Sequence, residues 1–231
     1  MQTLAITWLG HSSFRLRTPG GLEVLFDPWY TGNPMFPEAA RPTKADLILV
    51  SHGHSDHITD AAAVAKATGA TVVGIWELVS WLGSKGVQAV EPMNKGGTVS
   101  VKGLRITMTD AVHSSSIDES GIVYLGEPAG FVVTLENGQK IYFAGDTALF
   151  GDMKLIGEVH RPDIAFLPIG DRFTMGPDTA AIAAAWLGVR QVVPMHWGTF
   201  PLLTGTPEML KEHLAGSGIQ VLQLQPGETA E

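Results

Sequence analysis

The 231-residue chain contains no cysteine, which excludes disulfides and thiolate zinc ligands. It also lacks an apolar run of the roughly 18 residues that a membrane-spanning helix needs, and residues 1–9 lack the basic and long apolar regions of a signal peptide. Basic residues are few and scattered: 15 Lys and Arg stand against 23 Asp and Glu, for a net charge of -8. Nucleic-acid phosphates are held by clustered Lys and Arg, so we expect no contact with nucleic acid. Because the chain lacks a signal-peptide pattern and a long apolar run, we expect a cytoplasmic protein that makes no contact with a membrane.

Histidine, in contrast, is concentrated in one segment. Three of the 8 histidines and one aspartate fall within His52-Gly53-His54-Ser55-Asp56-His57, directly after the apolar run 47–50. Such a run is typical of a strand covered on both faces, and open α/β sheets bind ligands at the carboxyl ends of their strands. Neutral imidazole is the commonest metal ligand. Four ligands so close in sequence cannot all reach one tetrahedral ion without strain, so the segment predicts two neighbouring ions.

Two ions need further ligands, and three candidates each follow a predicted strand: His113 after residues 104–109, Asp146 after 140–144 and His196 after 191–195. Each of these residues alone is better explained as a buried side chain with a structural hydrogen bond. Their shared position at strand ends reverses that preference. We therefore expect them to complete one metal site with the first cluster.

The order and spacing of these residues resemble the metallo-β-lactamase superfamily along nearly the whole chain. Within it, the chain is similar to the UPF0173 metal-dependent hydrolases, relatives of the ascorbate-6-phosphate lactonases. The supporting motifs are Trp8-Leu9-Gly10-His11-Ser12, Phe26-Asp27-Pro28, Ala144-Gly145-Asp146-Thr147-Ala148-Leu149-Phe150-Gly151-Asp152-Met153, Leu167-Pro168-Ile169-Gly170-Asp171 and Met195-His196-Trp197-Gly198-Thr199-Phe200-Pro201.

The resemblance implies a ligand set for each ion. One ion would be held by His52, His54 and His113, a second by Asp56, His57 and His196, and Asp146 would bridge them. His54 stands where the diiron redox members of the superfamily carry Glu, which favours hydrolysis. The chain lacks the Cys ligand of the common zinc β-lactamases, which argues against antibiotic hydrolysis.

The expected function is that of a metal-dependent hydrolase. A hydroxide shared by the two ions would attack a small ester, lactone or phosphodiester. Asp56 would orient this nucleophile, and His11 is a candidate for protonating the leaving group, as is water on the second ion. Zinc fits the imidazole-rich set, although manganese and iron tolerate the same ligands. The alternative is a catalytically silent metal-binding sensor or scaffold of the same fold, but the filling of all seven ligand positions favours the enzyme.

The predicted fold is one α/β domain over residues 1–231, a four-layer αββα sandwich with the metals at one end of the sheets. Strands are expected at residues 3–9, 13–18, 22–26, 46–50, 70–74, 98–101, 104–109, 129–135, 140–144, 163–169, 191–195 and 219–223. Asn137-Gly138 predicts a hairpin turn. Helices are expected after Asp60, over 76–82, after Phe150, from Pro177 and from Pro207, where Thr206 is the N-cap.

Several other residues could take part in the site, and for three of these cases the sequence leaves two interpretations open. Asp27 either hydrogen-bonds a ligand histidine or forms an Asx-Pro turn. The serines 114–116 either donate to a substrate oxyanion or cap a loop, which is the commoner role. His11 either touches substrate or an outer-shell water, or is a structural histidine. Asp171, Arg172 and Thr174, in the loop before the Pro177 helix, are candidates for shaping the pocket.

The aromatic loop 29–36 is too apolar for an ordinary surface loop. It predicts either a lid over the metals or a contact in a homo-oligomer. In the first case the pocket rim would consist of Trp29, Tyr30, Met35 and Phe36, which suits a small-molecule substrate with an apolar part. His160 and His213 lie on predicted helices away from strand ends and are interpreted as surface residues.

Overall fold

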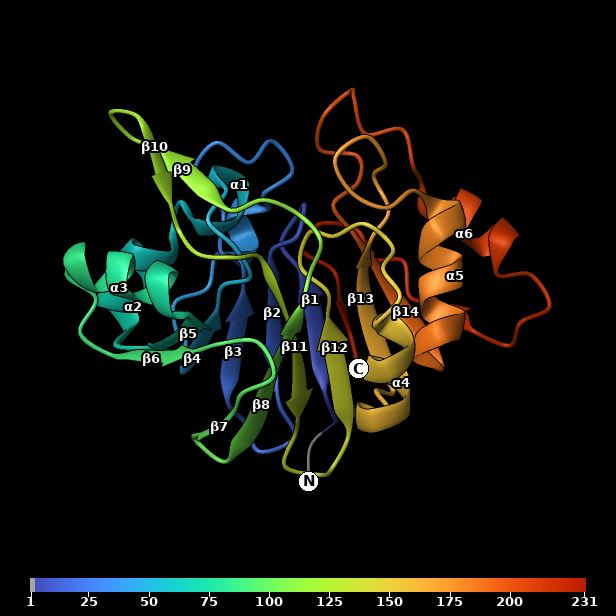
Figure 1. The fold of residues 1–231 in the computed structure, drawn as a ribbon, viewed down its shortest axis with the longest axis horizontal. Helices are drawn as coiled ribbons and strands as arrows, with labels where there is room; N and C mark the ends of the chain where they lie inside the picture. Colours follow the sequence, from blue (N-terminus) through green and yellow to red (C-terminus); the bar gives the residue numbers. More distant parts are fainter. Residues whose placement is uncertain (1–2) are drawn as a thin grey trace.

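In the computed structural model, which describes residues 3–231, two mixed β-sheets face each other and helices cover their outer sides (Figure 1). The first sheet has the strand order β16-β1-β2-β3-β4-β5-β6. Its strands are β1 (Ala5–Trp8), β2 (Phe14–Arg17), β3 (Glu23–Phe26), β4 (Leu47–Leu49), β5 (Thr71–Ile75), β6 (Val90–Met93) and β16 (Thr229–Ala230).

The second sheet has the order β15-β14-β13-β12-β11-β8-β7. Its strands are β7 (Thr98–Val101), β8 (Leu104–Asp110), β11 (Ala129–Thr134), β12 (Lys140–Phe143), β13 (Ile164–Pro168), β14 (Gln191–Met195) and β15 (Gln220–Val221). Each sheet is antiparallel through its early strands and parallel through its later ones. Asn137-Gly138 forms the predicted turn between β11 and β12, with Gly138 at φ 84°.

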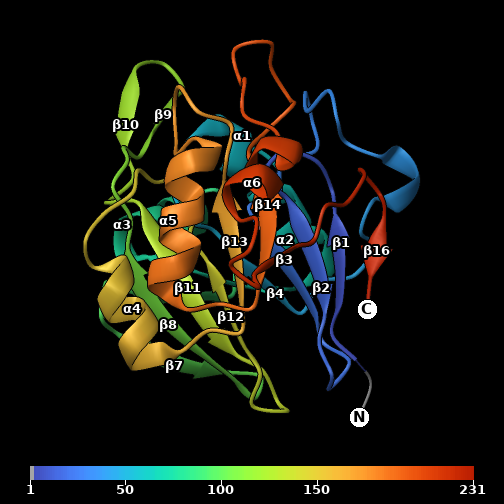
Figure 2. The ribbon, with the colours of Figure 1, turned by 90° about the vertical axis from the view of Figure 1, so that its right-hand side faces the viewer.

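The helices form the two outer layers. Beside the first sheet lie α2 (Ala61–Thr68) and α3 (Trp76–Ser84); beside the second lie α4 (Met153–His160), α5 (Pro177–Leu187) and α6 (Pro207–His213). Figure 2, viewed from the side of the second sheet, shows α4, α5 and α6 lying over it. The Thr206 side chain caps α6 by accepting from Met209 N, as the sequence predicts. The four-layer αββα prediction is confirmed.

Several short elements are absent from the sequence-based prediction. They are β6, β16, the 3-10 helix Glu38–Ala40, and the hairpin of β9 (Ser116–Asp118) and β10 (Ile122–Tyr124). β6 contains Pro92, which weakens its strand signal, but β6 is an edge strand, where the missing N–H is tolerated. β16 has two residues and pairs with β1, so the end of the chain returns to the first sheet.

Aromatic side chains from both sheets meet in the core. The ring centroids of Phe26 and Phe143 lie 4.6 Å apart, and those of Phe14 and Phe166 lie 4.9 Å apart. All four side chains are fully buried. Burying each contributes roughly 1.5–3 kcal/mol relative to exposure. This packing fixes how the strand ends of one sheet sit against those of the other.

The strand directions bring the predicted ligands to one end of the sandwich. β8 and β12 each pair antiparallel with β11 and so run the same way, and β12, β13 and β14 are parallel. The carboxyl end of β4 leads into α1 (Ser55–Ile58) at this same end, away from the two termini (Figure 1). Among residues 3–231, the helices are all too short or too polar to cross a bilayer.

Candidate metal centre

The first group of donors is His52, His54 and His113. One nitrogen from each lies within 4.8 Å of the others, and His52 Nε2 is 3.0 Å from His54 Nδ1. Gly53, between His52 and His54, allows the segment to pack closely against Leu125, because a Cβ at this position would lie 2.7 Å from the Leu125 side chain. Its N–H donates to Ser115 Oγ at 3.1 Å, which ties the segment to the strand end that carries His113.

The second group is formed by Asp56, His57 and His196, with His11 beside them. One possible ligand atom from each of the four lies within 4.8 Å of the rest. Asp56 and His57 are consecutive residues of the short helix α1, and His196 directly follows β14. The structure thus brings together the residues that the sequence assigned to one ion, although they are 140 positions apart at most.

Asp146 lies between the two groups. Its Oδ2 is 3.0 Å from His196 Nε2, 3.3 Å from His57 Nε2 and 3.7 Å from His113 Nε2. It is buried, and its Oδ1 makes no hydrogen bond among the described residues; the same holds for His57 Nε2 and His196 Nδ1. Buried polar atoms without partners are costly. Divalent ions would give such atoms partners, so the donors present fit the metal centre that the resemblance implies.

Asp27 is linked by hydrogen bonds to one histidine of each donor group, to His57 directly and to His52 through Ser51. Its Oδ2 accepts hydrogen bonds from His57 Nδ1 at 2.8 Å and from Ser51 Oγ at 2.6 Å, and Ser51 Oγ accepts from His52 Nδ1 at 2.9 Å. The structure therefore favours the first of the two interpretations of Asp27. With their Nδ1 atoms engaged, both histidines present Nε2 to the centre. Ser51 was missed in the sequence, where its position next to His52 was the only signal.

Burial and charge keep these donors in metal-binding protonation states. Burial lowers the pKa of His52 well below its ordinary value, and it lowers the pKa values of His54 and His113 as well. Burial alone would raise the pKa of Asp146, but the positive charges of His196 and His57 hold it well below the ordinary carboxyl value. Asp146 is accordingly ionised at neutral pH.

His57 differs from the other histidines. Burial acts to lower its pKa, but the charge of Asp146, whose Oδ2 lies 3.3 Å from Nε2, and the hydrogen bond to Asp27 raise it well above the ordinary value. In the metal-free protein this imidazole therefore holds a proton between two carboxylates. A divalent ion bound by His57 would replace that proton, so metal binding would release it.

His11 is fully buried behind Asp56 and does not line the pocket. A carboxylate only accepts, so His11 Nε2–H donates to Asp56 Oδ2 at 3.2 Å, and Nδ1 accepts the Thr199 hydroxyl at 2.8 Å. Burial, followed by the nearby His196, lowers the pKa of His11 to about 4, which leaves a neutral ring at pH 7. Of the interpretations open for His11, this geometry favours a role in orienting Asp56 over contact with substrate.

Three residues of this region have left-handed backbone conformations. They are His11 at φ 55°, Asp27 at 42° and His196 at 54°. Such conformations are uncommon for residues other than glycine and cluster at functional sites, where the surrounding packing maintains them. Here they turn side chains at three strand ends toward one point.

The donors form the floor of a pocket of about 300 Å³, whose lining residues are His54, Asp56, His113, Ser114, Asp146, Phe173, His196 and Phe200. The predicted rim of Trp29, Tyr30, Met35 and Phe36 is wrong, because none of these residues lines the pocket. Trp29 and Tyr30 are buried, and Asp60 Oδ2 accepts from the N–H groups of Tyr30 and Thr31. Trp29 packs its ring edge-on against His11 at 5.2 Å, so this part of the loop supports the site from behind.

The serines 114–116 were predicted either to donate to a substrate oxyanion or to cap a loop, and Ser114 and Ser115 differ in this respect. Ser115 is buried and accepts from Gly53 N, which is the structural role. Ser114 is exposed, lines the pocket and lies 3.3 Å from His54 Nε2. In the loop after Asp171, the residue that lines the pocket is Phe173, which the sequence reading passed over. His213 is exposed and His160 half-buried, both away from the donors.

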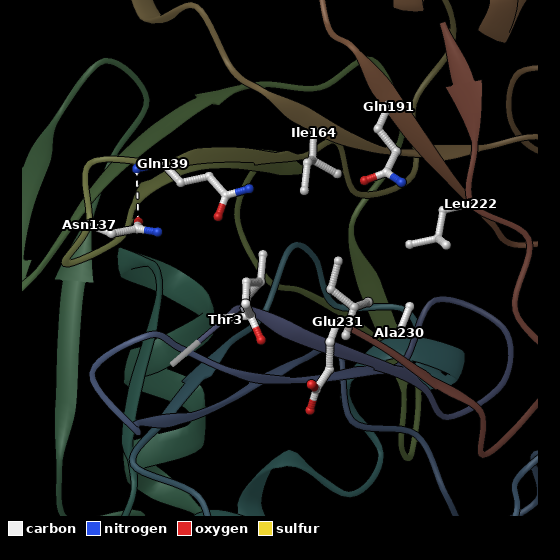
Figure 3. Close-up of a pocket in the computed structure, with 10 residues that line it drawn as sticks. Thr3, Asn137, Gln139, Ile164, Gln191, Leu222, Ala230 and Glu231 are labelled. Carbon is white, nitrogen blue, oxygen red and sulfur yellow. Dashed lines mark hydrogen bonds between the residues drawn. The ribbon is translucent and has the colours of Figure 1, made fainter. Parts of the chain in front are cut away.

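A second cavity, of about 340 Å³, opens between the two sheets near the β11–β12 turn (Figure 3). Thr3, Ala230 and Glu231 lie on one side and Gln139, Ile164 and Gln191 on the other. Apart from Glu231, the described side chains around it do not ionise. Its described lining therefore holds no histidine and no cluster of ionisable side chains that could bind a metal, and the histidine-lined pocket is the candidate active site.

Comparison with known proteins agrees with this site. Residues 23–197 match the model of the Beta-lactamase superfamily domain. A UPF0173 metal-dependent hydrolase of Rubrobacter xylanophilus is 53% identical, with 96% of this chain and 94% of the relative covered, and one of Methanopyrus kandleri is 48% identical over 99% and 100%. The solved structure of Igni18, a metallo hydrolase from Ignicoccus hospitalis, is 36% identical, with a TM-score of 0.89 over 99% of this chain and 98% of that one. The chain belongs to the UPF0173 metal-dependent hydrolases of the metallo-β-lactamase superfamily.

Proposed function

We propose that this hydrolase cleaves a small ester, lactone or phosphodiester with two divalent ions bound side by side. The observation that carries the proposal is the position of Asp146, whose single Oδ2 lies within 3.7 Å of histidines from both donor groups. One ion would be held by His52, His54 and His113 and the other by Asp56, His57 and His196, with Asp146 bridging. Zinc suits this set best, with manganese and iron as the alternatives.

When bound, two ions in one pocket supply a hydroxide nucleophile near neutral pH and polarise the scissile carbonyl or phosphoryl oxygen. Asp56 borders the pocket. Burial would raise its pKa, but the hydrogen bond from His11 and the charge of His57 lower it, so Asp56 is ionised. Its carboxylate would accept a hydrogen bond from the nucleophile and so orient it, while His11 and Thr199 hold Asp56 in place. The Ser114 hydroxyl, at the pocket wall, donates to a substrate oxygen.

The substrate is proposed to be a small molecule. A pocket of about 300 Å³ is at the lower end of the roughly 300–1,000 Å³ of ligand sites. The net charge of -8 favours a substrate other than nucleic acid. The cytoplasmic location expected from the sequence stays a prediction that cell fractionation would test.

Metal stoichiometry tests the two-ion proposal. Apo protein reconstituted with excess zinc and then desalted should retain two equivalents by elemental analysis. His113→Ala and His196→Ala should each retain about one, and Asp146→Asn should bind both ions more weakly. Circular dichroism identifies any variant that fails to fold. At most one equivalent in the wild type would contradict the proposal.

Turnover tests the reaction class. Bis-p-nitrophenyl phosphate, γ-butyrolactone, dihydrocoumarin, nitrocefin and a tRNA precursor should be compared with zinc and with manganese. We expect cleavage of the first three above the last two. Preferred cleavage of the tRNA precursor would overturn the small-substrate proposal. If none of the five substrates is cleaved by protein that holds both ions, the alternative of a metal-binding sensor would be favoured.

A further inference from the structure

Two phenylalanines line the candidate active site together with the donor residues. Phe173 and Phe200 are the apolar members of the pocket lining; all others are histidine, aspartate or serine. They come from different segments, Phe173 from the loop after β13 and Phe200 from the loop after β14. A substrate that reaches Asp146 therefore lies between or beside two flat rings.

Phe173 is 50% exposed, although it lines the pocket. The two residues before it, Asp171 and Arg172, are both left-handed, at φ 65° and 57°. The loop is tied down by Asp171 N donating to Met175 O at 3.0 Å and Met175 N donating to Thr147 O at 3.1 Å, directly after Asp146. The fold thus maintains a strained backbone that leaves Phe173 facing solvent at the pocket, as expected for a residue that contacts a ligand.

Phe200 is the more buried of the two aromatic lining residues. It is half-buried, with its ring centroid 6.0 Å from that of Trp29 and 5.7 Å from that of His11. These contacts hold the ring in one orientation. The aromatic loop 29–36 consequently acts on the pocket through Phe200 and His11 and not by covering it.

The charges of the pocket lining limit further which substrates can bind. None of the described lining residues is Lys or Arg, and the ionised carboxylates are Asp56 and Asp146. Arg172 packs its guanidinium 5.6 Å from the Phe173 ring but is not part of the lining. Two bound ions would neutralise the oxygen at the scissile bond. A second anionic group on the substrate would find no basic side chain there, and burying it unpaired is costly.

From these observations we infer that the substrate is a small ester or lactone whose remaining part is a flat apolar group held between Phe173 and Phe200, and that it carries no phosphate or carboxylate besides the group at the metals. This inference rests on the proposed two-ion hydrolase. It assigns Phe173 and Phe200 as specificity-determining residues, since aromatic rings favour stacked or edge-to-face contact with a second flat ring.

Binding of carboxylates to the zinc-loaded protein tests the inference separately from turnover. Benzoate, acetate and succinate are titrated by calorimetry into wild type, Phe173→Ala, Phe200→Ala and the control Ile122→Ala, whose parent side chain is 82% exposed on β10. We expect benzoate to bind wild type at least about tenfold more tightly than acetate or succinate, and each Phe variant to lose about tenfold for benzoate alone. Zinc content should be the same in all four proteins.

The same variants are then assayed on dihydrocoumarin and γ-butyrolactone. We expect Phe173→Ala and Phe200→Ala to raise KM for the aryl lactone with little change in kcat, and to leave the alkyl lactone unaffected. Equal affinity of wild type for benzoate and acetate, or tighter binding of succinate, would overturn the inference while leaving the hydrolase intact. Loss of zinc binding in the wild type would instead overturn the proposed function.

Discussion

His57 Nδ1 donates a 2.8 Å hydrogen bond to Oδ2 of the fully buried Asp27. Burial raises the pKa of Asp27, and the hydrogen bonds from His57 and Ser51 oppose that rise. One carboxylate at the end of β3 therefore sets the tautomer and direction of a histidine on α1 and, through Ser51, of His52. Such outer partners control how strongly a ligand binds its ion.

Asp27→Asn should weaken zinc binding by roughly 10–100-fold, because both carboxylate oxygens accept hydrogen bonds, Oδ1 from Ser51 N and Oδ2 from Ser51 Oγ and His57 Nδ1, and an amide turns an NH2 donor toward one of these donors. The measurement is competition with a zinc-binding dye, with folding checked by circular dichroism. Asp163→Asn is the matched control: Asp163 accepts from Lys140 N at 2.9 Å at the other end of the sheet. Equal zinc affinity in both variants would contradict the role assigned to Asp27.

His11 and Thr199 should act as one unit on Asp56. His11→Asn tolerates the left-handed backbone but is too short to keep the bond to Asp56, so kcat should fall by roughly 10–100-fold at full zinc occupancy. Thr199→Val should have a smaller effect. Because both changes disrupt the same hydrogen-bonded chain, the double variant should be no slower than His11→Asn. Additive losses in kcat would separate the two residues.

The metal-free protein should lose stability as pH falls from about 6.5 to 5. His11, His52, His54 and His113 have pKa values lowered by burial, so the unfolded chain binds more protons than the folded one below the ordinary imidazole pKa of about 6.5. His57, with its raised pKa, is protonated in the folded protein throughout; it opposes the loss while the unfolded chain takes up its proton around pH 6.5, but it is one histidine against four. Urea unfolding at pH 5, 6 and 7 with a chelator measures the effect; an unchanged free energy of unfolding would contradict it.

Gly145→Ala should damage both the fold and the metal centre. Gly145 has φ 62°, and a Cβ there would lie 2.8 Å from Ala129 O and from Ser51 Cβ. The conformational cost and the clash together should lower the free energy of unfolding by about 2–5 kcal/mol. Gly216→Ala is the control, with φ 79° and open space around the Cβ, and should cost about 1–2 kcal/mol. Equal losses would show that the contact with Ser51 is unimportant.

Among residues 3–231, the sequence alone indicated the strands that carry the donors and the order of the donors along the chain. The apolar run before His52 and the residues that follow 104–109, 140–144 and 191–195 already predicted a sheet with ligands at its strand ends. This worked because burial of a strand on both faces leaves a local pattern, and because imidazole and carboxylate side chains have few other reasons to follow such strands. The hairpin at Asn137-Gly138 and the cap at Thr206 are equally local and were equally readable.

Only the tertiary structure decided what surrounds the donors. The contacts of Asp27 with His57, of His11 with Thr199, and of Phe173 with the pocket join segments more than 20 residues apart. No local pattern encodes which distant side chain completes a hydrogen bond or a pocket wall. The aromatic loop 29–36 shows the same limit: its composition signalled burial or contact, but the packing of the two sheets placed Trp29 behind His11 and left the rim to Phe173 and Phe200. The sequence specifies which side chains are present and in what order, whereas the shape of the pocket depends on how the two sheets pack.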